Sequence, residues 1–151
     1  MSDIAEFISE VPDACKTFVT EAHEAMVKAG YKSKIVKKPG GSTAAYAHPK
    51  TKQVLAQFFF RKKVLHLYLY VVFFGDFNGY LDKLPRSVSD QLGVFNDCKR
   101  LHNPDACNPK CPMGYDFTVS DVRYRKCKYG RVTVVMNKES MGLLDILTKR
   151  V

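Results

Sequence analysis

The first thirty residues have the hydrophobic spacing of two helices. Ser2 or Asp3 can cap a short first helix, and Pro12 suits the first turn of a second one. Gly30 suits the end of that second helix, because glycine readily adopts the left-handed conformation common there. The apolar residues of the second helix recur at a 3.6-residue period, which predicts one buried face. They are Ala14, Phe18, Ala22, Ala25, Met26 and Ala29.

From residue 31 onwards the pattern changes from helical to extended. The sequence predicts strands through 35–36, at 43–48, at 53–60 and at 64–73, separated by turns rich in Pro, Gly and Lys. The last of these strands alternates strictly, which predicts a sheet with one dry face and one amphipathic face. The dry face would carry Leu65, Leu67, Leu69, Val71 and Phe73, and the other face His66, Tyr68, Tyr70 and Val72.

The C-terminal part combines a turn-rich segment with further short elements. Strands are predicted at 115–119, 122–128 and 131–136, and Asn137 suits the start of a final helix. Strand runs bracketed by helices, without regular βαβ alternation, predict an α+β fold. We therefore expect an antiparallel sheet with helices packed on one face, N- and C-terminal helices and a cysteine-rich loop.

Length and charge indicate the number of domains and the candidate partners of this protein. The chain has 151 residues, and no repeat or linker divides it, so we expect residues 1–151 to form a single domain. The formal net charge of +9 attracts polyanions, which makes nucleic acid one candidate partner beside an unknown small ligand or protein. The sequence leaves open whether the protein is a monomer or a homodimer.

The sequence has no feature that predicts secretion or membrane insertion. No basic segment followed by an apolar one stands at the N-terminus. The longest apolar stretch, 64–74, is interrupted by His66 and is too short to cross a bilayer as a helix. We therefore expect a cytoplasmic protein with no membrane partner, in which cysteines are kept reduced.

Four of the five cysteines lie between positions 98 and 127 and form the most distinctive cluster of the sequence. Cys98, Cys107, Cys111 and Cys127 supply four thiols, and His102 could replace one of them. Thiolates and imidazoles are the ligands that structural zinc prefers, and three prolines would stiffen the loop. Only Cys107 and Cys111 have the close spacing of typical zinc-ligand pairs.

Other chemistry for this cluster stays open. The thiols could be packed as small hydrophobic groups, or form a redox pair or a disulfide. A thiol-dependent enzyme would use Cys107 or Cys111 as its nucleophile, because nearby Lys and Arg residues lower thiol pKa. No Cys-x-x-Cys or G-x-S-x-G motif is present, so no catalytic residue is assigned. The favoured hypothesis is a binding domain, not an enzyme, whose cysteine loop is structural and is a candidate zinc site.

The polar face of the strand at 64–73 suggests a second candidate site. His66, Tyr68 and Tyr70 could form the wall of a ligand site or stack against nucleic-acid bases. The RNP sequence typical of RNA-recognition motifs is absent. A nucleic-acid-binding module that uses this basic, tyrosine-bearing face is the alternative to the zinc-loop hypothesis.

The order of elements resembles the small YdhG-like α+β domains of unknown function. The similar features are the N-terminal helix, the strands at 43–60 and 64–72, and a closing strand and helix from Arg131 to Leu147. The resemblance implies an antiparallel sheet flanked by helices, and the cysteine loop departs from it. Some members of that group are described as iron-handling proteins, but this chain is basic where iron handling needs acidic side chains. No functional residue is carried over.

Overall fold

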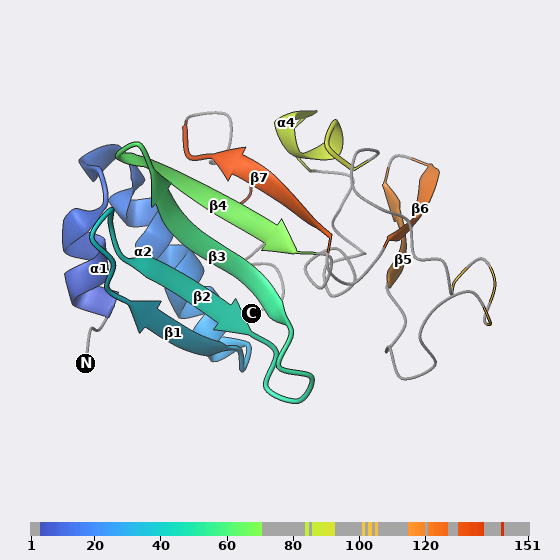
Figure 1. Ribbon diagram of the computed structural model, residues 1–151, viewed down its shortest axis with the longest axis horizontal. Helices are drawn as coiled ribbons and strands as arrows, with labels where there is room; N and C mark the ends of the chain where they lie inside the picture. Colours follow the sequence, from blue (N-terminus) through green and yellow to red (C-terminus); the bar gives the residue numbers. More distant parts are fainter. Residues whose placement is uncertain are drawn as a thin grey trace.

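The computed structural model describes residues 4–70, 84, 86–92, 101, 103, 105, 115–119, 121–126, 130–137 and 143. It confirms the predicted α+β class (Figure 1). Most of the predicted C-terminal helix and of the cysteine-rich loop lies outside these residues. The elements are α1 (Ile4–Glu10), α2 (Asp13–Lys28), β1 (Lys32–Val36), β2 (Thr43–Ala47), β3 (Val54–Arg61), β4 (Val64–Tyr70), α4 (Arg86–Ser89), β5 (Tyr115–Val119), β6 (Val122–Lys126) and β7 (Arg131–Val135).

Five strands form the main sheet, and the order across it is β1-β2-β3-β4-β7. Every neighbouring pair is antiparallel. The first four strands therefore follow one another as a meander, and β7 adds to the far edge beside β4. Strands β5 and β6 pair only with each other, as a hairpin beyond the end of the sheet at which β4 stops (Figure 1).

Local sequence signals set both ends of α2. Pro12 precedes the helix with the φ of −55° that its ring imposes. At the other end Gly30 adopts a φ of +100°, its N–H donates to Val27 O, and the N–H of Tyr31 donates to Met26 O. These two bonds make the Schellman arrangement, in which a left-handed glycine satisfies carbonyl groups that the helix leaves free. Gly30 therefore ends the helix as its position in the sequence predicts.

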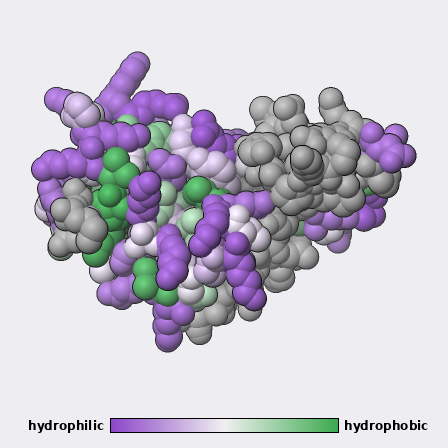
Figure 2. Space-filling view, turned by 60° about the horizontal axis from the view of Figure 1, so that its bottom comes forward, coloured by the Kyte–Doolittle hydropathy of each residue, from purple (hydrophilic) through white to green (hydrophobic). Residues whose placement is uncertain are grey.

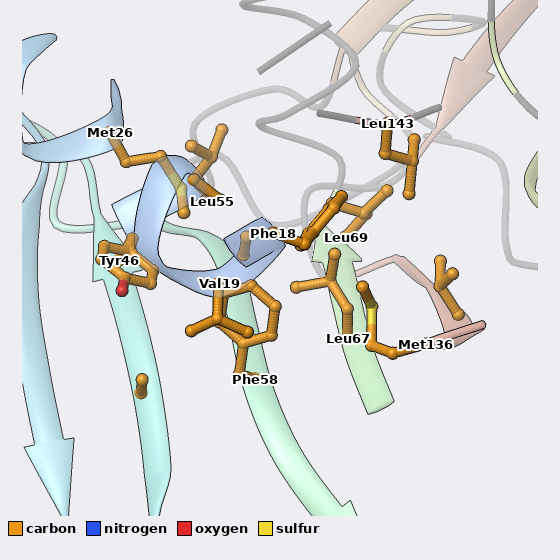
Figure 3. Close-up of a cluster of buried hydrophobic side chains, with 14 of the residues drawn as sticks. Phe18, Val19, Met26, Tyr46, Leu55, Phe58, Leu67, Leu69, Met136 and Leu143 are labelled. Carbon is orange, nitrogen blue, oxygen red and sulfur yellow. The ribbon is translucent and has the colours of Figure 1, made fainter. Parts of the chain in front are cut away.

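Helices α1 and α2 pack on the same face of the main sheet, behind it in the view of Figure 1. Phe58 of β3 is fully buried at this interface, with its ring centroid 6.3 Å from that of Phe7 in α1 and 6.3 Å from that of Phe18 in α2. Burying a phenylalanine contributes roughly 1.5–3 kcal/mol. Figure 3 shows how side chains from α2 and the strands meet in this core, with Met136 and Leu143 at its edge.

One polar contact lies inside this packed layer. Tyr46 of β2 is fully buried, and its hydroxyl lies 2.7 Å from Nδ1 of His23 in α2. Burial raises the pKa of Tyr46 and lowers the pKa of His23, against a smaller opposing effect of Glu24. The phenol and the imidazole are therefore both neutral near pH 7, and each satisfies the other.

Two turns at the same end of the sheet contain unusual backbone conformations. The β3–β4 hairpin closes through only Lys62 and Lys63, whose φ angles of 51° and 65° are both left-handed. A two-residue hairpin needs this geometry, which Asn-Gly adopts more easily than lysine does. In the β1–β2 turn Gly41 has a φ of +125°, and a Cβ added there would lie 2.6 Å from Cδ2 of Phe60. This glycine is required both by its conformation and by the close approach of the ring.

The outer edge of β7 is closed by a side chain. Gln91, just after α4, donates from Nε2 to the carbonyl of Thr133 at 2.6 Å and accepts from the N–H of Thr133 at 2.9 Å. The amide thus pairs with β7 as one residue of a further strand would. None of the helices in the described ranges is long and apolar enough to cross a membrane.

Candidate functional site

The face of the main sheet opposite α1 and α2 is here called the outer face. Alternation along each strand and the pairing register together assign its side chains, because directly opposed residues point to the same side. Figure 1 is viewed onto this face, and none of the described helices crosses it. Its residues are Lys32, Lys34, Val36, Thr43, Ala45, Ala47, Val54, Gln57, Phe59, Arg61, Val64, His66, Tyr68, Tyr70, Arg131, Thr133 and Val135.

Charge is distributed unequally between the two sides of the sheet. The strands of the main sheet contain four lysine or arginine residues and no aspartate or glutamate. All four cations belong to the outer face: Lys32, Lys34, Arg61 and Arg131. Helices α1 and α2, on the other side, carry five acidic residues. The outer face therefore presents positive charge without neutralising carboxylates of its own strands, which favours an anionic ligand.

Aromatic rings of β3 and β4 form a stack across this face. The ring of Phe59 is stacked on that of Tyr68 with centroids 4.1 Å apart, and on that of His66 with centroids 5.2 Å apart. Tyr70 continues the group with an edge contact to Tyr68, at 6.1 Å. Phe59 is 8% exposed, whereas the other three are half-buried. Phe59 is thus the most deeply buried ring of the stack, and the three rings on β4 are partly exposed to solvent.

Both arginines of the outer face are held by Tyr68. Arg61 donates from Nη2 to the Tyr68 hydroxyl at 3.2 Å. The guanidinium carbon of Arg131 lies 4.0 Å from the centre of the Tyr68 ring, and its Nη1 donates to the Tyr70 hydroxyl at 3.3 Å. Because β3 and β7 lie on opposite sides of β4, Phe59 and Arg131 occupy opposite faces of the Tyr68 ring. Tyr68 therefore positions cations and leaves no ring face open for a ligand.

The two arginines are oriented but not neutralised within the described part of the chain, where neither forms an ion pair with a carboxylate. Arg123 of the β5–β6 hairpin is different, because Asp116 binds it through both carboxylate oxygens. That contact lowers the pKa of Asp116. A planar guanidinium in a fixed position with its charge unpaired is suited to bind phosphate or carboxylate oxygens.

Three of the residues predicted from the sequence as a candidate site lie together in the structure. His66, Tyr68 and Tyr70 lie in line on β4, all on the outer face. Phe59 and Arg131, which the sequence analysis did not single out, complete the cluster. Phe59 lies in a run of three phenylalanines that gives no alternation, and its pairing with His66 places it on this face. Arg131 is brought in by the long-range pairing of β7 with β4. No local signal in the sequence reveals that pairing.

The cysteine cluster is not tested by the structure. Cys98, His102, Cys107, Cys111 and Cys127 all lie outside the described residues, so the zinc, redox and nucleophile hypotheses stay predictions. Within the described ranges, no three His, Cys, Asp or Glu side chains converge as metal ligands.

The remaining cysteine is part of the core. Cys15 of α2 is 5% exposed, and burial raises its pKa. A raised thiol pKa reduces the fraction of reactive thiolate. Cys15 is therefore a packed thiol, in agreement with its position on the buried side of the helix.

In comparisons with protein-family models, with curated proteins and with solved structures, no family, protein or structure matches this chain. The resemblance to YdhG-like domains accordingly stays an expectation from the order of elements.

Proposed function

We propose that this protein binds single-stranded nucleic acid on the outer face of its main sheet. The observation that carries the proposal is that every lysine and arginine of these strands lies on the face that carries the aromatic stack, and that the strands contain no carboxylate. Phosphate groups supply the matching negative charge, and bases supply the matching planar surfaces.

Arg61 and Arg131 are already oriented in the structure, which favours binding of phosphate. Each is already fixed by a tyrosine, so little side-chain freedom is lost when a phosphate binds. Lys32 and Lys34 extend the positive surface across the sheet to β1, where both are exposed. A backbone of closely spaced phosphates can contact several of these cations at once, which a single small anion cannot do.

The aromatic part of the proposal favours single strands over duplexes. A sheet face with half-buried rings can be contacted by unstacked bases, which single strands offer and duplexes hide. His66 and Tyr70 lie at the two ends of the ring cluster and are half-buried, so their rings retain surface for contact. Among the coloured residues of Figure 2, hydrophilic ones predominate and hydrophobic ones form separate areas, which suits a polar ligand more than an apolar one.

Fluorescence anisotropy with labelled single strands of about ten nucleotides tests the proposal. We expect binding whose affinity falls steeply with salt, with a slope of log K against log salt of up to about −3 if all four cations meet phosphates. Replacing Arg131 by Gln should reduce both the affinity and this slope. A matched duplex should bind less tightly at the same salt concentration.

The control variant is Lys28→Gln, which removes one exposed positive charge from α2, on the other side of the sheet. It changes the net charge as much as Lys34→Gln does. If both variants weaken binding equally, the attraction comes from overall charge and not from the outer face. Absence of binding to any single strand at low salt would end the proposal.

A further inference from the structure

One row of side chains crosses the outer face through all five strands. The register pairs Lys34 with Ala45, Ala45 with Gln57, Gln57 with Tyr68, and Tyr68 with Thr133. Neighbouring strands are about 4.8 Å apart, so Lys34 on β1 and Gln57 on β3 are separated by roughly 10 Å across Ala45. Side-chain length therefore varies along the row. Lys34 is long, Ala45 has only a methyl group, and Gln57 and Tyr68 are large again.

Small side chains continue along β2 on either side of this row. The outer-face residues of that strand are Thr43, Ala45 and Ala47, none of which extends far from the backbone. On one side of this strip stand the lysines of β1, and on the other stands the aromatic cluster of β3 and β4. A flat group placed on the strip would thus have a cation at one end and ring edges at the other.

Gln57 faces this strip with an unused amide. The side chain is half-buried, and no described residue hydrogen-bonds to it. A glutamine amide carries two N–H donors and one carbonyl acceptor, and it can bind the edge of a base through a donor and an acceptor together. A partly exposed amide beside a cationic surface can exchange its solvent contacts for the polar groups of a ligand.

We propose that the row Lys34–Ala45–Gln57 is a base-reading subsite: a phosphate lies against Lys34, its base lies over Ala45, and the Gln57 amide binds the edge of that base. This inference rests on the proposed function and specifies its ligand. The preferred base is adenine, whose N6 amino donor and N7 acceptor lie side by side and match a glutamine amide. The base must leave its stack to lie flat over Ala45, so the ligand is single-stranded.

Anisotropy measurements with three probes at about 0.1 M salt test the subsite. The probes are oligoadenylate, oligothymidylate and a sugar-phosphate chain of the same length without bases. We expect the wild-type protein to bind oligoadenylate roughly tenfold more tightly than oligothymidylate. Gln57→Ala should remove most of this preference and leave the slope of affinity against salt unchanged.

Two further variants separate the parts of the subsite. Lys34→Gln should lower the salt slope by about 0.7 for all three probes and keep the base preference. Ala45→Leu should weaken binding of the base-bearing strands and leave the chain without bases unaffected. Circular dichroism of each variant checks that the fold is retained.

The outcomes distinguish the inference from the proposed function. A preference for oligoadenylate that disappears in Gln57→Ala supports the subsite, and a preference for oligothymidylate overturns it. Equal binding of all strands by the wild type, or a preference that survives Gln57→Ala, overturns the subsite and leaves nucleic-acid binding by the outer face intact. If the wild-type protein binds none of the probes, both ideas fail.

Discussion

The close approach of Gly41 to Phe60 can be tested as a stability difference among three glycines. Gly41 combines a φ of +125° with a predicted Cβ contact of 2.6 Å to the Phe60 ring. Gly30 has a φ of +100° but nothing within 4 Å of an added Cβ, and Gly40 has neither constraint. Alanine at these positions therefore separates backbone strain from steric overlap.

The expected magnitudes follow from these differences. Gly30→Ala should lower the free energy of unfolding by about 1–2 kcal/mol, the cost of a left-handed residue with a side chain. Gly41→Ala carries a similar backbone cost plus overpacking of about 1–3 kcal/mol, so we expect roughly 2–5 kcal/mol in total. Gly40→Ala should stay within about 0.5 kcal/mol of the wild type.

Urea unfolding followed by circular dichroism gives these free energies, and a double mutant identifies the obstructing group. If the Phe60 ring causes the overlap, Gly41→Ala should cost about 1–3 kcal/mol less in a Phe60→Ala background than in the wild type. Equal costs of Gly41→Ala and Gly30→Ala would refute the close approach. Additive effects of the two substitutions would show that the ring is not the obstructing group, since the Phe60 Cβ, 2.9 Å from the added atom, is retained in alanine.

Three other predictions concern separate parts of the molecule. Replacing Lys62-Lys63 by Asn-Gly should raise the free energy of unfolding by about 1 kcal/mol, because the two-residue turn needs positive φ at both positions. Urea titrations measure this change, and unchanged stability would contradict the prediction. Burial holds the folded-state pKa of His23 below its ordinary value of about 6.5, so protonation favours the unfolded state. Stability should be undiminished above about pH 6.5 and fall as the pH drops through the folded pKa. This part of the fall should vanish in His23→Gln. Native mass spectrometry should find about one zinc per chain if the cysteine cluster closes a tetrahedral site, and Cys98→Ser should then lose the metal. A metal-free mass with all cluster thiols freely alkylated would exclude that hypothesis.

The sequence predicts those features whose cause is local. Gly30 ends α2 because a left-handed glycine is needed at that point, and the alternation of Leu65 to Tyr70 assigns two faces of β4 without knowledge of its neighbours. The run Phe58-Phe59-Phe60 is harder, since three equal residues give no alternation. Only pairing with β4 shows that Phe59 belongs to the outer face and Phe58 to the core.

The candidate site depends on contacts between residues distant in sequence. Arg131 reaches Tyr68 because β7 pairs with β4 after sixty intervening residues, and such pairing is set by packing of the whole sheet, not by a local motif. The predicted strand ends at residue 60, yet Arg61 is the last residue of β3 and its side chain donates to Tyr68.

The amide of Gln91 has a consequence for how copies of this protein meet at high concentration. It occupies the hydrogen-bonding groups of Thr133, so a strand from a neighbouring molecule cannot add to β7 at this residue without displacing it. At the other edge, joining two molecules through β1 would bring their Lys32 and Lys34 side chains together. Repulsion between these lysines disfavours such pairing at low ionic strength, and concentrated salt, by screening it, should promote edge-to-edge joining of sheets.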